Sequence, residues 1–242
     1  MSHPSRRAFS VGALTLVGAG LSGCAGSGRS SPFAGALDRL PFGIGGGGSG
    51  PGRTLSRPDY ARVYARIEGE RHPVAAFRYA SLAPEFLRQE VAYTGREEAG
   101  TVVVDPKSRL LYLVGERGRA TRYGVGVGRD GFRWSGEARI NMKRDWPDWV
   151  PPAEMVARDP EIRSELVQTP RGLGVPGGPR SPLGARAMYL FADGDTGYRI
   201  HGTTEPGTIG TNVSSGCIRM VNQDVIHLYH RTPEGARVVV LG

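Results

Sequence analysis

A histidine and a cysteine lie sixteen positions apart, at His201 and Cys217, in a stretch rich in small residues. A thiol attacks a carbonyl carbon as the thiolate, so a nucleophilic cysteine needs an imidazole to take its proton and small neighbours that leave the sulfur accessible. The sequence Ser-Ser-Gly directly precedes Cys217 and supplies such neighbours. The stretch therefore predicts a cysteine nucleophile, Cys217, with His201 as its base.

Both residues also have ordinary structural interpretations. A cysteine among small and aliphatic residues is often a buried core residue, and a histidine at the end of a strand is often structural. Two observations favour catalysis: Cys217 is the only cysteine after Cys24, and Gly202 follows His201 at the end of the predicted strand Tyr198–Ile200. A side chain at such a position projects from a sheet edge into a cleft.

The order of these residues resembles that of the L,D-transpeptidases of the YkuD type, enzymes that cross-link peptidoglycan. Their signature is His-Gly, a gap, and then Ser-His-Gly-Cys or Ser-Ser-Gly-Cys followed by Ile-Arg-Met. The resemblance covers about residues 99–241, because further family blocks occur in the same order at 100–105, 123–128 and 182–187. Ser215 stands where many members carry a second histidine, so no role of that histidine is carried over.

The resemblance implies a reaction and roles for the site. Cys217 would attack the carbonyl between meso-diaminopimelate and the terminal D-alanine of a tetrapeptide stem, leaving a thioester that an amine resolves. That amine would come from a second stem or from a protein, such as an outer-membrane protein. The carbonyl of Gly202 would orient His201, and the amides of Ser215, Gly216 and Cys217 would hold the oxyanion. Neither a metal nor a cofactor is expected.

Two other functions stay open from the sequence. With water as the acceptor, the protein would be a hydrolytic amidase or carboxypeptidase on the same stems, and the residues do not separate amine from water acceptors. Without activity, it would be a non-catalytic wall-binding lipoprotein. Ser215 in place of histidine is the one feature that favours this last alternative.

Four residues are candidates for substrate binding. Arg219 carries a planar guanidinium that binds carboxylates, which peptide stems present, although an exposed arginine also forms simple surface salt bridges. Ser214 lies close to the nucleophile in the sequence. Trp146 and Trp149 lie in a proline-stiffened loop that either caps the cleft or packs inward as a hydrophobic plug.

The remaining histidines and a glycine-rich run are interpreted as structural. His227 and His230 have a spacing that suits a metal, but no cluster of cysteines or carboxylates completes a ligand set. His72 is expected to be solvated. The run Gly124–Gly128 superficially resembles a dinucleotide fingerprint, yet no apolar helix follows it, so it is predicted as a strand.

The apolar pattern predicts a mainly β fold, a YkuD-type sandwich or barrel of mixed short strands. One C-terminal helix is expected at about 222–230, capped by Asn222, and a short helical segment is expected to precede the strands. Strands are predicted at 101–104, 110–114, 119–127, 136–142, 187–192, 197–201 and 237–241, and N-terminal helices at 58–70 and about 84–91.

Four segments follow from the organisation of the chain. Residues 1–23 resemble an export signal, with Arg6 and Arg7 before an apolar run too short to span a bilayer. The two arginines suggest a twin-arginine signal, with ordinary secretion as the alternative, and Leu21–Cys24 resembles a lipobox in which Cys24 is lipidated. Residues 24–57 form a glycine-rich flexible tether, 58–98 the helical segment, and 99–242 the catalytic domain.

The net charge and the predicted export signal limit the possible partners and the location of the protein. The net charge of +8 becomes +6 once residues 1–23 leave, because two arginines and no acidic residue are removed. A basic protein suits an anionic membrane surface or a carboxylate-bearing wall polymer. Nucleic acid is not expected, because no run of basic residues interleaved with aromatics occurs. The location expected is the periplasm of a Gram-negative bacterium, with a lipid anchor in the outer membrane more than in the inner one.

The lipid anchor is testable at its cysteine. Changing Cys24→Ala should abolish incorporation of radiolabelled palmitate, because the lipid is attached to that sulfur. Labelling of cells followed by immunoprecipitation measures this, and wild-type protein that never takes up the label contradicts lipidation.

Overall fold

The computed structural model describes residues 57–128, 134–214 and 216–242. The predicted signal peptide, Cys24 and the tether up to residue 56 lie outside the described residues, and so does Ser215. None of the helices within the described ranges is both long and apolar enough to cross a membrane.

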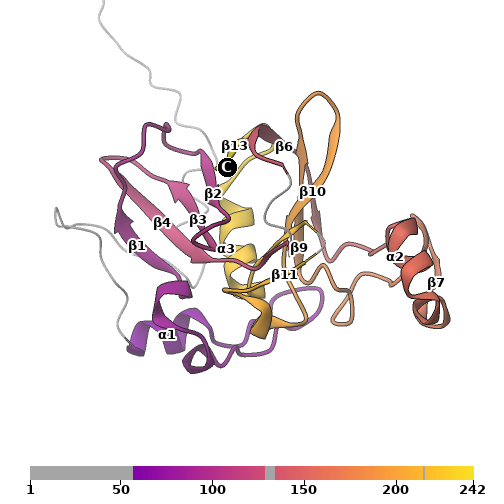
Figure 1. Ribbon diagram of the computed structural model, residues 1–242. Helices are drawn as coiled ribbons and strands as arrows, with labels where there is room; N and C mark the ends of the chain where they lie inside the picture. Colours follow the sequence, from indigo (N-terminus) through magenta and orange to yellow (C-terminus); the bar gives the residue numbers. More distant parts are fainter. Residues whose placement is uncertain (1–56, 129–133, 215) are drawn as a thin grey trace, which may run out of the picture. The chain divides into compact units, whose positions relative to one another are not determined.

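A nine-stranded mixed sheet is the main element of the fold (Figure 1). Its strand order is β1-β4-β3-β2-β13-β6-β9-β10-β12. Neighbouring strands are antiparallel except for the pairs β13–β2 and β10–β12, which are parallel. The mainly β fold class predicted from the sequence is confirmed.

The strands are short, and two pairs lie outside the large sheet, β11 with β5 and β7 with β8. The bounds are β1 Gln89–Ala92, β2 Val102–Asp105, β3 Leu110–Val114, β4 Arg119–Gly124, β5 Val127–Gly128, β6 Gly136–Asp145, β7 Val167–Thr169, β8 Gly172–Gly174, β9 Arg186–Phe191, β10 Asp195–His201, β11 Asn212–Ser214, β12 Ile218–Arg219 and β13 Arg237–Val240.

Helical elements are fewer. The α-helices are α1 Arg57–Val63, α2 Ala153–Arg158 and α3 Asn222–Arg231, and the 3-10 turns are Tyr79–Ser81, Pro84–Phe86, Pro160–Glu165 and Pro206–Thr208.

The hairpin of β2 and β3 forms as its sequence predicts. Val102, Val103 and Val104 fill β2, and β-branched side chains suit an extended backbone. All three are buried, because β2 lies in the middle of the sheet and is covered on both faces. Asp105 ends the strand, and its carboxylate accepts a hydrogen bond from the N–H of Ser108 at 3.1 Å, which closes the turn.

The large sheet closes on itself beside β12. Arg219 in β12 and Gly126, just after β4, exchange two backbone hydrogen bonds, each 2.9 Å long. β12, the last strand in the order, thereby contacts the segment that directly follows β4, the second strand in the order. Further along, β5 pairs in parallel with β11 through Val127 and Asn212.

Two glycines let this part of the chain lie close to neighbouring backbone. A Cβ atom at Gly126 would lie 2.6 Å from the carbonyl oxygen of Thr208, and one at Gly124 would lie 2.4 Å from that of Phe86. The backbones therefore approach more closely than any side chain allows. The strand predicted over 119–127 is accordingly interrupted, because β4 ends at Gly124 and β5 begins only at Val127.

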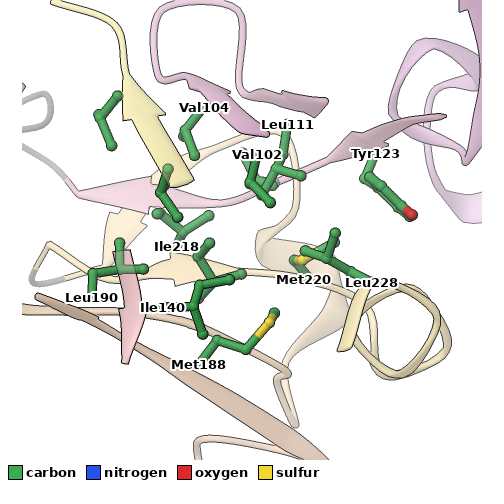
Figure 2. Close-up of a cluster of buried hydrophobic side chains, with 14 of the residues drawn as sticks. Val102, Val104, Leu111, Tyr123, Ile140, Met188, Leu190, Ile218, Met220 and Leu228 are labelled. Atoms are coloured by element: carbon green, nitrogen blue, oxygen red, sulfur yellow. The ribbon is translucent and has the colours of Figure 1, made fainter. Parts of the chain in front are cut away.

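Side chains from both halves of the strand order meet in one hydrophobic core, which Figure 2 shows. Helix α3 contributes Val225 and Leu228, both fully buried, so the amphipathic pattern that predicted this helix is confirmed. The fully buried core residues labelled in Figure 2 are Val102, Val104, Leu111, Tyr123, Ile140, Met188, Leu190, Ile218, Met220 and Leu228.

Several local predictions are wrong, and non-local pairing is the reason. Helix α1 ends at Val63, not at residue 70, because Ile67 pairs with Val74 through two backbone hydrogen bonds. The helix predicted at about 84–91 is a single 3-10 turn followed by β1, which pairs with β4. Helix α2 and the strands β7, β8, β11 and β12 have no counterpart in the sequence prediction.

The N-terminal segment 57–98 is fixed to α3 by buried polar groups. The Tyr64 hydroxyl donates to the Asp224 carboxylate at 3.1 Å and accepts the backbone N–H of Arg88 at 2.8 Å. The Arg88 guanidinium lies 3.5 Å from the same carboxylate, and both side chains are almost fully buried. Burial raises the pKa of Asp224 to about 6, while the charge of Arg88 opposes that rise. A buried carboxylate of this kind depends on its one cation.

Removing that cation should destabilise the protein in a pH-dependent way. We expect Arg88→Met to lower the free energy of unfolding by about 3–5 kcal/mol at pH 8, because Asp224 is then a buried charge without a cation. The loss should shrink at pH 5, since a carboxyl whose pKa is raised in the fold is protonated there. Urea unfolding at both pH values measures this. The double variant Arg88→Met, Asp224→Asn should recover most of the stability, and an equal loss at both pH values contradicts the assignment.

Candidate active site

The parallel pairing of β10 with β12 brings the two predicted catalytic residues together. His201 is the last residue of β10, and Cys217 directly precedes β12. Ile200 pairs with Ile218, which places Cys217 level with Arg199 on the neighbouring strand. His201 and Cys217 line one cleft with a volume of about 230 Å³.

The other residues around this cleft come from β9, β10, β12 and the segment 146–185 between β6 and β9, called the excursion below. They are Asp148, Trp149, Val150, Pro152, Met155, Arg171, Pro182, Leu183, Tyr189, Gly197, Arg199 and Arg219.

The His201 ring is held by the residue that follows it. Its Nδ1 lies 2.6 Å from the carbonyl oxygen of Gly202, and a carbonyl only accepts hydrogen bonds, so Nδ1 carries the proton in the neutral ring. Nε2 is therefore the nitrogen that can accept a proton. This is the contact expected from the sequence for a base oriented by the main chain.

Asn222 fixes the loop on which that carbonyl lies. Its side-chain oxygen accepts the N–H of Ala185 at 3.0 Å, and its nitrogen donates to the carbonyl of Thr203 at 3.1 Å. A Cβ atom on Gly202 would lie 2.2 Å from the Asn222 oxygen, so only glycine fits beside it. The sequence prediction that Asn222 caps α3 is wrong, because Val221 is the capping residue and the Asn222 side chain is used here instead.

Burial favours the neutral form of both predicted catalytic groups. It lowers the pKa of His201 to about 4, opposed by the Gly202 carbonyl and reinforced by the charges of Arg219 and Arg199. It raises the pKa of the half-buried Cys217 thiol, against a backbone hydrogen bond from Arg199 and the positive charges of Arg199 and Arg219. These pKa directions favour a thiol and a neutral imidazole in the cleft at neutral pH over a preformed ion pair.

Arg219 lies in the cleft and also forms a salt bridge, the two alternatives considered from the sequence. It lines the cleft, and its Nη1 lies 2.9 Å from the Glu205 carboxylate, with its side chain 22% exposed. On the neighbouring strand, Arg199 binds both oxygens of Asp195, at 2.8 and 2.9 Å. Two cations thus flank the catalytic pair, and each is balanced by a carboxylate.

The two tryptophans take different places. Trp149 is half-buried and lines the cleft. Trp146 is a buried plug, 4% exposed, whose Nε1 donates to Glu70 at 3.3 Å, and it borders a separate hollow beside Val74. The prediction of a substrate-binding role is wrong for Trp146, because its ring packs against the N-terminal segment.

The histidines outside the site are largely structural, as predicted. His227 is buried in α3, and its Nδ1 lies 2.7 Å from the Tyr123 hydroxyl, while the exposed His230 packs edge-on against the Tyr229 ring. His72 is not solvated as expected, because its ring packs edge-on against Trp146 and its Nε2 is buried. Within the described ranges, no three His, Cys, Asp or Glu side chains come together to hold a metal ion.

The predicted oxyanion residues are partly described. Gly216 has φ +129°, a backbone conformation that favours glycine, and a Cβ atom there would lie 3.0 Å from the Tyr198 ring. Ser214 ends β11, where it pairs with Gly128, and Ser215 is not among the described residues. The catalytic roles of these positions stay predictions.

Most of the cleft lining was missed by the sequence prediction, including Arg199, Tyr189 and Arg171. Arg199 lies two positions before His201 in the same strand, and strand alternation alone places both on one face, so a signal for it existed. Tyr189 and Arg171 come from β9 and from the turn between β7 and β8. Nothing local marks Arg171, because only the tertiary fold brings its hairpin to the cleft.

The chain belongs to the YkuD family of L,D-transpeptidase catalytic domains, whose family model matches residues 99–240. It is 32% identical over 156 residues to the probable L,D-transpeptidase YbiS of Escherichia coli strain K12, a match that covers 63% of this chain and 47% of YbiS. It is also 43% identical over 76 residues to the putative L,D-transpeptidase YkuD of Bacillus subtilis strain 168, covering 31% and 46% of the two chains. The chain thus spans about half the length of these curated relatives.

A solved structure from Brucella melitensis is also similar. That protein, described as a probable carnitine operon oxidoreductase, is 48% identical in a match that covers 68% of this chain and 99% of that one, with a TM-score of 0.45. The oxidoreductase name is given to that protein, whereas residues 99–240 of the present chain match the L,D-transpeptidase family.

The raised pKa of the Cys217 thiol predicts how its reactivity changes with pH. Alkylation of Cys217 by iodoacetamide should rise steadily into the alkaline range, because the raised pKa of the thiol leaves little thiolate at pH 5–8. The Cys24→Ala chain, in which Cys217 is the only cysteine, allows the rate to be followed by intact-protein mass spectrometry. A plateau of fast alkylation between pH 5 and 8 would indicate a preformed thiolate–imidazolium pair and contradict this description.

Proposed function

We propose that this protein is a cysteine L,D-transpeptidase that cleaves the bond between meso-diaminopimelate and D-alanine in peptidoglycan tetrapeptide stems. The observation that supports this most directly is the shared cleft of Cys217 and His201, with the imidazole Nδ1 bound to the Gly202 carbonyl. Membership of the L,D-transpeptidase family supports the same reaction class.

In the proposed acylation, the Cys217 thiol passes its proton to Nε2 of His201 as the sulfur bonds to the scissile carbonyl carbon. A neutral imidazole is needed for this step, and the lowered pKa of His201 keeps it neutral down to about pH 4. Backbone amides at Ser215, Gly216 and Cys217 stabilise the resulting oxyanion. The C–N bond then breaks, D-alanine leaves with the proton from Nε2, and a thioester remains.

In the proposed second step, an amine attacks the thioester carbonyl and gives a proton to Nε2 of His201. The C–S bond breaks, the sulfur takes the proton back, and a new amide is released. An amine from a second stem gives a cross-link between two third residues, and an amine from a protein attaches that protein to the wall. Arg219 and Trp149 border the cleft in which the stem would lie, and Ser214 is proposed to contact it as well.

The proposed setting is the periplasm of a Gram-negative bacterium. The sequence features of residues 1–24 support export and lipidation of Cys24, with the outer membrane favoured over the inner one. The glycine-rich residues 24–57 would act as a tether between that anchor and the wall. The basic balance of +6 without residues 1–23 suits an anionic polymer.

The reaction is testable with a disaccharide tetrapeptide and the purified chain. Wild-type protein should release D-alanine and form cross-linked dimers, read by mass spectrometry. Cys217→Ala should retain less than about a hundredth of the activity, and His201→Ala should lose about 100-fold, the usual contribution of positioned proton transfer. His230→Ala serves as the matched control and should leave the activity unchanged.

The products separate the alternatives. Tripeptide without dimers indicates hydrolysis of the same bond. No change in the stem with folded wild-type protein contradicts catalysis and favours a wall-binding protein. Activity that persists in Cys217→Ala overturns the covalent mechanism.

A further inference from the structure

The excursion between β6 and β9 carries a hairpin whose tip reaches the cleft. Strands β7 and β8 are joined by a two-residue turn, Pro170–Arg171, and the hairpin projects away from α3 beside α2 (Figure 1). The Thr169 hydroxyl donates to the Gly172 carbonyl at 2.7 Å and accepts the N–H of Arg171 at 3.2 Å. The backbone at the tip is thus fixed by local hydrogen bonds, and Arg171 lines the cleft.

The Arg171 side chain is held against a buried tyrosine of the sheet. Its Nη1 donates to the Tyr189 hydroxyl at 3.0 Å, and its guanidinium carbon lies 5.4 Å from the centre of the Tyr189 ring. Tyr189 itself is 4% exposed and lies on β9. The contact directs the guanidinium and occupies one of its five N–H donors.

Arg171 differs in charge balance from the other two cleft arginines. Arg199 and Arg219 are paired with Asp195 and Glu205, whereas no carboxylate among the described residues forms an ion pair with Arg171. Asp195 is near enough to interact electrostatically with it, but both Asp195 oxygens are bound by Arg199.

The acidic residue of the cleft itself, Asp148, accepts the N–H of Gly177 through Oδ1 at 2.8 Å and forms no ion pair with Arg171 among the described residues. A guanidinium that is directed into a cleft without a carboxylate partner suits an incoming carboxylate, which it binds with two parallel hydrogen bonds.

The strand register sets the distance from the nucleophile. Tyr189 pairs with Arg199, and Cys217 is level with Arg199 on the next strand. Neighbouring strands are about 4.8 Å apart, so the backbone of Tyr189 lies about 10 Å from that of Cys217 across the sheet. The carboxylate of the leaving D-alanine is only about 4 Å from the scissile carbon, nearer to the sulfur than to the strand that holds Arg171. This separation favours a ligand on the part of the stem that stays on the enzyme.

We infer that Arg171, positioned by Tyr189, binds a carboxylate on the acyl side of the donor stem. The two candidates are the side-chain carboxylate of the diaminopimelate and the carboxylate of the residue that precedes it. This inference rests on the proposed function, since it names a determinant of donor specificity at the same site. Recognition of this kind distinguishes stems with carboxylates from stems with carboxamides, because an amide group cannot pair with the charge of Arg171.

The test compares donors and variants with the full chain. Three disaccharide tetrapeptides are used, one with both carboxylates present and two in which one or the other is a carboxamide. For Arg171→Gln we expect kcat/KM for D-alanine release from the first donor to fall about 10- to 100-fold, mainly through KM. Amidation of the recognised carboxylate should lower wild-type kcat/KM by a similar factor and leave Arg171→Gln unchanged, and the donor that shows this identifies the carboxylate.

Three further variants separate recognition from structure. Arg171→Lys should recover part of the activity on the carboxylate donor, since it restores the charge without the fork. Tyr189→Phe keeps the ring but removes the hydroxyl that holds Nη1, and should raise KM with less effect on kcat. Arg180→Gln, at an exposed position of the same excursion, is the charge-matched control and should stay within about twofold of wild type.

The outcomes separate the inferred role of Arg171 from the proposed function of the protein. If Arg171→Gln still distinguishes carboxylate from carboxamide donors as wild type does, or loses the same factor on all three through kcat, the inference is overturned and Arg171 is a packing residue. If wild type releases D-alanine but does not distinguish the donors, the inference fails while the proposed function stands. If wild type releases no D-alanine from any donor, the proposed function fails, and the inference fails with it.

Discussion

The backbone pairing of Arg219 with Gly126 is the constraint on which the rest of this structure depends. Two hydrogen bonds of 2.9 Å join β12 to the chain beyond β4 and so close the sheet beside the candidate site. The close approach requires glycine at position 126, because a Cβ atom would meet the Thr208 carbonyl at 2.6 Å. With β12 held there, its parallel pairing with β10 leaves Cys217 no place other than beside Arg199, in the cleft that His201 lines.

Burial then gives this site its chemistry. A low-dielectric environment disfavours charge on both groups, which lowers the pKa of the imidazole and raises that of the thiol. In the acylation proposed above, the proton therefore moves as the sulfur attacks. Such a site relies on the position of the base more than on a stored thiolate. Two sets of contacts fix that position. The Gly202 carbonyl accepts a hydrogen bond from the Nδ1–H of His201, and Asn222 holds the loop of Gly202 through Ala185 and Thr203.

Residues that precede the family match are part of the same fold. Strand β1 extends the sheet next to β4, and Arg88 balances the buried Asp224 of α3. Glu70 accepts hydrogen bonds from both Arg186 and Trp146, so it supports β9 and the start of the excursion that carries Arg171. The N-terminal segment thus supports the start of β9 and the start of the excursion, two elements whose later residues border the cleft.

The sequence by itself determined what is local. The valines of β2, the amphipathic pattern of α3 and the motif of His201 and Cys217 predict an element or a chemical role from a few neighbouring residues, and the structure contains these elements. Only the tertiary structure decided the rest. Ile67 pairs with Val74, and residues 89–92 pair with the distant strand β4, and these backbone pairings outweigh the local helical pattern. Trp146 is buried and Asn222 is diverted from the helix cap because their partners lie far away in the chain. Arg171 reaches Tyr189 because the sheet positions its hairpin, and no spacing of residues encodes that contact.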